Sequence, residues 1–258
     1  MSELDRLWIG TSGWVYPHWR GVFYPPKLTT SRWLPFYAEH FRTVEINNTF
    51  YRLPSERAFR DWRAAVSPGF RFAVKANRFI THTKKLREPA EPLERFLSRA
   101  RLLGDRLGPI LYQLPPRWRC NLPRLRDFLT ILPRDLTHVF EFRDPSWMNE
   151  DVFAALEEHG AALCVISHPM MSCPVRTTSD VVYIRMHGAQ TLYASCYSEE
   201  ELQWWAEQVR EALAGGRQVH VYFNNDAFGY AVRNAQRLGE LLGLPGSIPG
   251  QALRSFAG

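Results

Sequence analysis

Eight short apolar segments, separated along the whole chain by amphipathic helical stretches, are the feature that most constrains the fold. Each has the composition of a buried strand: LWIGTSG, TVEINNTF, FRFAVKAN, PILYQLP, THVFEFRD, AALCVIS, VVYIRMHG and QVHVYFNND. Strands that alternate with helices form parallel βαβ units. Eight such units within 258 residues predict an α/β fold, a single (β/α)8 TIM-type barrel.

The connections between these segments orient the barrel. Links from helix to strand are short, whereas links from strand to helix are long, as in WVYPHWRGVFYPPKLTT and RFITHTKKLREPAE. Long loops on one face are what a barrel uses to build a site. The helix after strand six is expected to be irregular or missing, because SHPMMSCPVRTTSD has no helical pattern. We expect one domain over residues 1–258, with a core at about 8–243 and a tail at 244–258. A doubly wound open sheet is less favoured, since GTSG lacks the spacing of a dinucleotide-binding loop.

Polar residues occupy the carboxyl ends of most of these strands. Side chains alternate between the two faces of a strand, so Val44 and Ile46 should face the helices while Glu45 and Asn47 face the lumen. The same alternation directs inward Lys75, Gln113, Glu141, Arg143, Arg185, His187, Asn224 and Asp226. Barrel enzymes keep their chemistry at these strand ends. A buried polar group left unpaired costs about 1–3 kcal/mol, so the pattern favours a functional site over a purely structural one. The structural alternative is an ion-pair plug that closes the barrel mouth.

The residue types at this mouth favour an enzyme acting on a phosphorylated or nucleic-acid-type anionic substrate by hydrolase-like acid–base chemistry. The catalytic candidates are Glu45, Glu141, His187 and Asp226, because carboxylates and imidazole exchange protons near neutral pH. Arginine and lysine would hold phosphate oxygens. The substrate-binding candidates are Asn47, Lys75, His82, Gln113, Arg143, Arg185, Asn224, Tyr51 and Trp14.

Two of these assignments have structural or chemical alternatives. The aromatic residues of the first long loop could stack bases or sugars, or could instead pack as a hydrophobic lid: Trp14, Tyr16, Trp19, Phe23 and Tyr24. Lys75 on a barrel strand also fits a Schiff-base lysine, although a charged anchor is the simpler interpretation.

Two other functions remain open at this stage. Glu45 and Glu141 could be the carboxylate pair of a metal-free carbohydrate-active enzyme, in which their separation would set the stereochemical outcome. Alternatively, the mouth could bind an anion or nucleic acid without turnover. Salt dependence of binding and the effect of Glu141→Gln on turnover would separate these functions.

Composition agrees with a cytoplasmic protein that has an anionic partner. The net charge of +6 is divided unevenly: residues 1–134 hold 24 basic and 11 acidic residues (+13), and residues 135–258 hold 8 and 15 (−7). This asymmetry indicates a small anion or nucleic acid as partner, or else arginine-rich solvated helix faces. The start MSELDRLW is not a signal peptide, and no apolar run reaches the roughly 20 residues of a membrane span. The four cysteines form no CxxC pair and are expected to be reduced. The oligomeric state is left open.

Several long motifs resemble the YecE-like family, also known as domain of unknown function 72. They are GTSGWVYPHWRGVFYP, VEINNTFYRLPS, FAVKANRFITH, LGPILYQLPP, FEFRDPSW, YIRMHG and VYFNNDAFGYAVRNA, in the family's order. The resemblance implies a TIM-type barrel distantly similar to endonuclease IV and xylose isomerase, with nucleic-acid binding suggested by analogy. Endonuclease IV holds several zinc ions on many His and carboxylate ligands. Here the metal candidates at the strand ends are only Glu45, Glu141, His187 and Asp226, with His82 and His168 on loops, which would suffice for one divalent ion. No organic cofactor is indicated.

Overall fold

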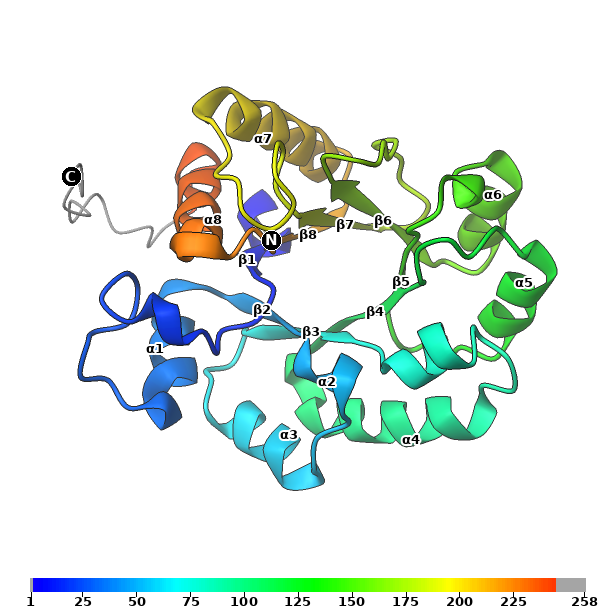
Figure 1. Cartoon of the computed structure of the whole chain (residues 1–258), viewed down its shortest axis with the longest axis horizontal. Helices are drawn as coiled ribbons and strands as arrows, with labels where there is room; N and C mark the ends of the chain where they lie inside the picture. The colour runs from blue at the N-terminus through cyan, green and yellow to red at the C-terminus, as the bar shows by residue number, and fades with distance from the viewer. Residues whose placement is uncertain (1, 245–258) are drawn as a thin grey trace.

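Eight parallel strands form a ring with helices on its outside, in a computed structural model that describes residues 2–244 (Figure 1). The strands are β1 (Leu7–Thr11), β2 (Thr43–Ile46), β3 (Arg71–Lys75), β4 (Leu107–Gln113), β5 (His138–Glu141), β6 (Ala162–Ser167), β7 (Val181–Met186) and β8 (Gln218–Phe223). The α-helices are α1 (Trp33–His40), α2 (Asn48–Tyr51), α3 (Glu56–Ala64), α4 (Ala90–Ala100), α5 (Leu122–Thr130), α6 (Glu150–Glu158), α7 (Glu199–Ala214) and α8 (Tyr230–Leu241). The predicted single (β/α)8 TIM-type barrel is confirmed.

Shorter helical turns decorate the loops. They are η1 (Glu3–Arg6), η2 (Pro17–Trp19), η3 (Thr30–Arg32), η5 (Arg101–Arg106), η6 (Pro145–Trp147) and η7 (Ala227–Gly229), with a π-helical turn at η4 (Phe79–Thr83). The connection from β6 to β7 contains no helix, as the sequence predicted. Residues 245–258, which include most of the expected tail, lie outside the described residues. Within residues 2–244, no helix is both long enough and apolar enough to cross a membrane.

The segment TVEINNTF is only partly a strand, so the expectation of a strand through Phe50 is wrong. β2 ends at Ile46, and the chain then turns into the short helix α2. Thr49 drives this turn, because its hydroxyl donates to the Ile46 carbonyl at 3.1 Å and lies 2.6 Å from the Lys75 carbonyl on β3. The turn brings α2 over the end of β3, where it contributes to the site described below.

The barrel closes between β1 and β2 through an unusual seam. The main-chain pairing here is a single bridge between Ser12 and Glu45, whose carbonyl accepts from the Gly13 amide at 2.8 Å. Below it, the Tyr37 hydroxyl of α1 lies between the strands, 2.9 Å from the Thr11 amide and 3.1 Å from the Thr43 carbonyl. It therefore substitutes for a direct ladder bond.

The interior of the barrel has an apolar middle and a polar upper end. The middle is filled by the inward side chains Ala73, Leu111, Val139, Ala162, Cys164, Ile166, Val181, Tyr183 and Tyr222. Outward side chains such as Val44, Ile46 and Val74 join the larger core beneath the helices. This is the alternation predicted for β2, and it places Glu45 in the lumen, fully buried.

Helix α7 is capped at both ends. Ser198 is its N-cap and forms a capping box with Glu201, and Gly215 is the C-cap residue. The helix packs against β8, the strand that leads to Asn224.

Candidate functional site

Arg185 links the two buried glutamates of the barrel mouth. From β7, its Nη2 donates to Glu45 Oε1 at 2.7 Å, and its Nη1 donates to Glu141 Oε2 at 2.5 Å. All three side chains are at most 1% exposed. Glu45 also accepts from the hydroxyls of Ser12 and Tyr183, each at 2.7 Å. Strands β2, β5 and β7 are therefore joined across the lumen by one charged hydrogen-bond network.

Glu141, like Glu45, accepts hydrogen bonds from three side chains. Besides Arg185, it accepts from the Arg143 guanidinium and, at 3.2 Å, from the Gln113 amide. Burial alone would raise the pKa of Glu141. Arg143 and Arg185 outweigh this effect by stabilising the charged form, so the pKa of Glu141 lies well below its usual value. Glu141 is thus a fixed anion across the physiological pH range.

His187 lies beside Glu141 as a fully buried, neutral imidazole. Its Nε2 is 2.8 Å from Arg143 Nη2, and its Nδ1 is 3.1 Å from Nδ2 of Asn224, so N–H donors face both ring nitrogens. Burial lowers the pKa of His187 to about 3, and the guanidiniums of Arg185 and Arg143 act in the same direction. A neutral imidazole with so low a pKa fits substrate positioning better than the acid–base role predicted from the sequence.

Lys75 is the one cation of the mouth that has no carboxylate partner among residues 2–244. It ends β3 with its side chain 9% exposed, and its Nζ lies 4.2 Å from the centroid of the Phe50 ring on α2. Burial lowers the pKa of Lys75 to about 8, reinforced by Arg185. Directly after β2, the Oδ1 atom of Asn47 is buried and has no hydrogen-bond partner among residues 2–244. An unpaired amine and an unpaired acceptor at the same end of adjacent strands are the signature of a place for a ligand.

His82 approaches this part of the mouth from η4. Its ring meets Phe50 edge-on at 4.9 Å, and its Nδ1 is 2.9 Å from the Thr81 hydroxyl. Burial lowers the pKa of His82 to about 4, and the charge of Lys75 adds to the effect. The predicted approach of this loop histidine to the site is thus consistent with its position.

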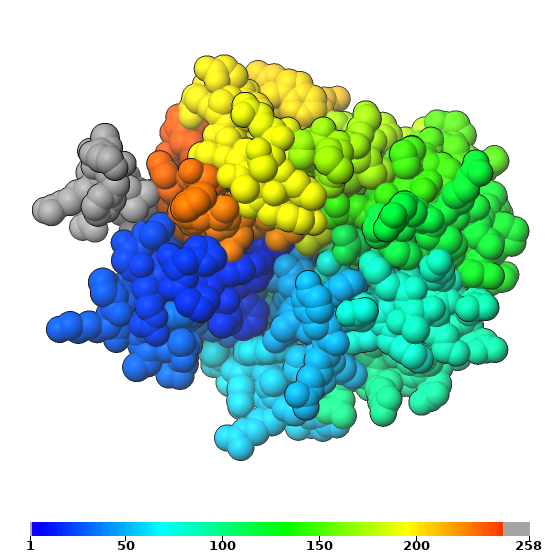
Figure 2. Space-filling model, viewed as in Figure 1, coloured from blue at the N-terminus to red at the C-terminus, as the bar shows by residue number. Residues whose placement is uncertain are grey.

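Asp226 belongs to a different contact, between the loop after β8 and the first long loop. It accepts from Trp19 Nε1 at 2.7 Å and pairs with His18 Nε2 at 3.1 Å. Figure 2 shows the two segments, blue and orange, side by side on this face. Burial raises the pKa of Asp226 to about 6. Through these contacts Asp226 connects the two loops. The sequence had grouped it with the catalytic carboxylates.

Two of the aromatic candidates do not face the lumen. Trp14 is buried against Trp62 of α3 in an edge-to-face contact, and its carbonyl accepts from the Tyr24 hydroxyl at 2.6 Å. Tyr51 is 72% exposed at the end of α2. The first loop instead forms a packed aromatic cluster, because Trp19 and Tyr24 are themselves buried and Tyr24 stacks on Trp33. This corresponds to the hydrophobic lid considered from the sequence.

The side chains do not fit a metal centre. Among residues 2–244, no three His, Cys, Asp or Glu side chains converge as ligands of one ion. Of the four candidates, Glu45 and Glu141 are neutralised by Arg185, Asp226 is bound to His18 and Trp19, and Nε2 of His187 faces a guanidinium. The single divalent ion considered from the sequence therefore has no ligand set here.

Sequence reasoning missed three residues of the site. Tyr183 and Ser12 both bind Glu45, and Phe50 lies under the amine of Lys75. The alternation of β7 could have identified Tyr183, because it is two residues before Arg185 and shares its face. Phe50 carried no such signal, since its position depends on the helical turn that replaced the expected strand.

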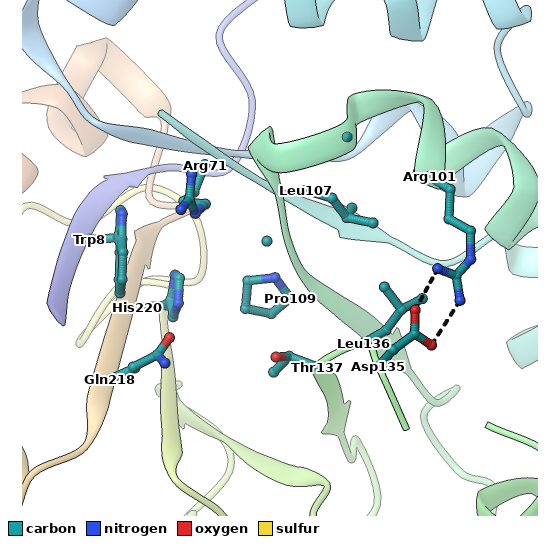
Figure 3. A pocket seen from close by; sticks show the side chains of 12 residues that line it. Trp8, Arg71, Arg101, Leu107, Pro109, Asp135, Leu136, Thr137, Gln218 and His220 are labelled. Atoms are coloured by element: carbon teal, nitrogen blue, oxygen red, sulfur yellow. Dashed lines mark hydrogen bonds and ion pairs between the residues drawn. The ribbon is translucent and has the colours of Figure 1, made fainter. Parts of the chain in front are cut away.

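A cavity of about 390 Å³ opens at the opposite, N-terminal end of the barrel (Figure 3). Trp8 and His220 form its stacked wall, with ring centroids 4.6 Å apart. Its charges are already satisfied: Arg101 forms a two-pronged pair with Asp135, and Arg71 donates to the Asp105 carbonyl at 2.8 Å. Since this end of a TIM barrel contributes stability rather than chemistry, the cavity is the weaker candidate despite its volume.

With this geometry established, comparison with known proteins identifies the family. The model of the family described as "Protein of unknown function DUF72" matches residues 8–254. The chain belongs to this family. The chain is also similar to the UPF0759 protein YunF of Bacillus subtilis (strain 168), 26% identical over 92% of this chain and 94% of that protein. The UPF0759 protein YecE of Escherichia coli (strain K12) is 34% identical over 55% of this chain and 50% of its own length. The resemblance to the YecE-like family is confirmed.

Solved DUF72 structures agree with the fold. A DUF72 family protein (TM1631) from Thermotoga maritima MSB8 superposes with a TM-score of 0.82 at 32% identity, covering 92% of this chain and 98% of that one. A DUF72 family protein (EF0366) from Enterococcus faecalis V583 gives a TM-score of 0.80 at 21% identity, covering 92% and 95%. This chain therefore shares its barrel fold with these two DUF72 proteins.

Proposed function

We propose that this protein is an enzyme acting on a small anionic molecule held at the C-terminal mouth of the barrel. One observation supports this proposal most directly: the buried network has one cation more than it has anions. Three cationic side chains face two carboxylates, and the unmatched one is Lys75; the five are Lys75, Arg143, Arg185, Glu45 and Glu141. A buried charge without a counter-ion is costly, so an anionic ligand would stabilise this arrangement.

The depth of the site favours a small molecule over a polymer. Glu45, Glu141 and Arg185 are at most 1% exposed, and Arg143 has only 9% of its side chain exposed. A backbone phosphate of a nucleic-acid duplex could not enter so deeply buried a site. A compact phosphate or carboxylate could reach Lys75 and Arg143. Gln113, which is half-buried, could orient such a ligand.

The carboxylates fit positioning better than proton transfer. A carbohydrate-active pair needs one glutamate with a raised pKa to act as the acid. The pKa of Glu141 is instead well below its usual value, and a single guanidinium lies between the two glutamates. This geometry supports neither the glycosidase alternative nor a hydrolase in which Glu141 is the general acid.

Anion binding at Lys75 can be tested with inorganic phosphate and a matched pair of lysine variants. Phosphate should raise the unfolding free energy of the wild type by about 2.7 kcal/mol at a hundredfold excess over its Kd. Lys75→Met should lose this response, whereas Lys84→Met should keep it, because Lys84 lies on the loop after η4 and pairs with Glu88. The measurement is chemical denaturation with and without phosphate at constant ionic strength. An equal response in all three proteins would place the anion elsewhere and contradict the proposal.

We also propose a cytoplasmic location. All four cysteines are free thiols, and the one that lines the lumen, Cys164, is buried. This supports a reducing compartment.

A further inference from the structure

The amine of Lys75 has an environment that differs from that of an ordinary charged anchor. An anchoring lysine is usually paired with a carboxylate, but both glutamates of the mouth are already bonded to Arg185. Nζ instead lies over the face of the Phe50 ring, 4.2 Å from its centroid. Among residues 2–244, no hydrogen bond or ion pair joins this amine to another side chain. It is a buried primary amine that points into the mouth of a barrel.

Charges on four elements face this amine and together set its protonation. Burial is the largest influence and lowers the pKa of Lys75 to about 8, while Arg185 on β7 and Arg143 after β5 act in the same direction. Glu141 on β5 and Glu45 on β2 oppose them but do not compensate. His82 on η4 also faces the amine and, with its own pKa lowered to about 4, is neutral there. At pH 8 about half of the amine is therefore uncharged, against well under about 1% for a lysine with an ordinary pKa.

We propose that Lys75 is a nucleophile that forms an imine with a small anionic aldehyde or ketone, such as a 2-oxo acid or a phosphorylated carbonyl compound. This names the substrate class of the anion site and rests on the proposed function. An uncharged, water-poor amine on a barrel strand is the form of lysine that attacks carbonyl groups.

The chemical step is balanced without any further reagent. The lone pair of neutral Nζ attacks the carbonyl carbon, a C–N bond forms, and the C=O π electrons move to oxygen, which takes up a proton. The nitrogen then loses a proton to solvent, giving a carbinolamine. Protonation of the hydroxyl lets water leave with the C–O bonding electrons, and the nitrogen lone pair closes the C=N bond as a protonated imine. Amine, carbonyl and one proton thus give iminium and one water, with no oxidant or reductant consumed.

The charge of the network agrees with an anionic carbonyl compound in particular. With Lys75 neutral, Arg143 and Arg185 balance Glu45 and Glu141. The iminium adds one positive charge, and a single negative charge on the substrate restores the balance. A neutral aldehyde would leave the buried cation uncompensated, so the site should prefer an anionic carbonyl compound over an uncharged one of similar size.

Reductive trapping on the whole protein tests this inference directly. Glyoxylate, which combines an aldehyde with a carboxylate, and sodium cyanoborohydride at pH 8 would convert an imine into a stable carboxymethyl-lysine. The chain has only four lysines, Lys27, Lys75, Lys84 and Lys85, so peptide mass mapping can compare all of them. We expect the adduct on Lys75 to exceed that on the exposed Lys27 and Lys85 by at least about tenfold, since its neutral fraction at pH 8 is about a hundredfold larger. Acetaldehyde, which lacks the carboxylate, should show a much smaller preference for Lys75.

Two variants and one ligand complete the test. Lys75→Arg keeps the positive charge but cannot form an imine, so it should lose the dominant adduct, while Lys84→Arg should retain it. Phosphate should slow trapping at Lys75 by competing for the site. Adducts distributed according to exposure, or an unlabelled Lys75, would overturn the inference. If phosphate still stabilises the protein in that case, the anion site survives and only the imine fails; if phosphate also has no effect, both proposals fail.

Discussion

At the scale of single residues, the mouth of this barrel is organised by one arginine shared between two acids. Arg185 uses separate nitrogens for Glu45 and Glu141, and each acid has further partners of its own. Burying charges in this way contributes little net stability when all are paired, but removing one partner leaves others uncompensated. The network therefore holds its side chains in fixed positions, and its effect on the unfolding free energy becomes large only when one partner is removed.

Replacing Arg185 by methionine should reveal this cost. We expect Arg185→Met to lower the unfolding free energy at pH 8 by about 3–5 kcal/mol, because two carboxylates lose their shared cation. Tyr183→Phe, the control, removes one hydrogen bond to Glu45 and should cost about 1 kcal/mol. Urea denaturation of the three proteins measures both differences.

The pH dependence of the same variant has a definite sign. In the wild type the pKa of Glu141 is held below its unfolded value, so its contribution is present above about pH 4.5 and is lost as the pH falls further. Without Arg185, only Arg143 opposes the effect of burial on Glu141, so the pKa of Glu141 moves up and its protonation at low pH relieves part of the destabilisation. The deficit of Arg185→Met should thus be smaller at pH 5 than at pH 8. An equal deficit at both values would mean that the loss comes from packing rather than charge.

Much of this network was predictable because alternation along a strand is a strict rule. It placed Glu45, Glu141 and Arg185 on one face without any knowledge of the partner strands. The rule fails beyond the strand ends, where the chain leaves the pleat: Asp226 is three residues past the end of β8 and pairs with η2 instead of the lumen. Partners also could not be read from sequence, since pairing depends on how the ring brings distant strands together.

At the scale of elements, the seam between β1 and β2 depends on the absence of a side chain. A Cβ atom at Gly10 would lie 2.2 Å from the Thr43 carbonyl oxygen, a main-chain atom that cannot move aside cheaply. Gly10→Ala should therefore force the strands apart and lower the unfolding free energy by about 1–3 kcal/mol. Gly239→Ala is the control, because within residues 2–244 its Cβ would meet only Leu244, at 3.6 Å, and the substitution suits helix α8. Equal stability of Gly10→Ala and wild type in thermal and urea unfolding would show that the seam tolerates a wider spacing.

The contact between η2 and the loop after β8 should titrate. Burial raises the pKa of Asp226 to about 6, so the protonated carboxyl stabilises the fold fully below its unfolded pKa near 3.8 and this contribution is lost as the pH rises through 6. Asp226→Asn keeps an oxygen for Trp19 but cannot ionise, so the change in unfolding free energy between pH 4 and pH 7 should be smaller than in the wild type. Asp61→Asn, on the exposed side of α3, should leave the profile unchanged. Identical profiles for wild type and Asp226→Asn would contradict the assignment.

The elements themselves were predicted better than their ends. All eight strands and the missing helix between β6 and β7 follow from apolar runs and turn residues, which act locally. The helix α2 could not be predicted, because it is stabilised by Thr49 bonding to the carbonyl of Lys75, a residue 26 positions away. For the same reason, the sequence could not predict that helix α2 places Phe50 under Lys75.

At the scale of the whole molecule, the charge asymmetry raises the question of nucleic acid again. The basic half, residues 1–134, forms the part of the barrel from β1 to α5, coloured blue to green in Figure 1. Its arginines include several exposed ones in ion pairs, such as Arg63 with Asp105 and Arg101 with Asp135. The excess of surface charge should attract any polyanion weakly, independently of the recessed mouth.

Binding of single-stranded DNA and of phosphate should therefore respond differently to the same substitution. We expect a generic oligonucleotide to bind weakly at low salt and to be released by about 200 mM salt, with a slope set by the number of surface phosphate contacts. Lys75→Met should change this affinity by less than about twofold, because Lys75 is only 9% exposed and therefore lies below the surface that a polymer can contact. In phosphate titrations the same variant should lose its response. Fluorescence anisotropy over a salt series measures the affinity for the oligonucleotide. Chemical denaturation with and without phosphate measures the stabilisation by the anion. If Lys75→Met instead weakened oligonucleotide binding about tenfold and reduced the salt slope by about one, the polymer would reach the mouth, and a nucleic acid would replace the small anion as the ligand.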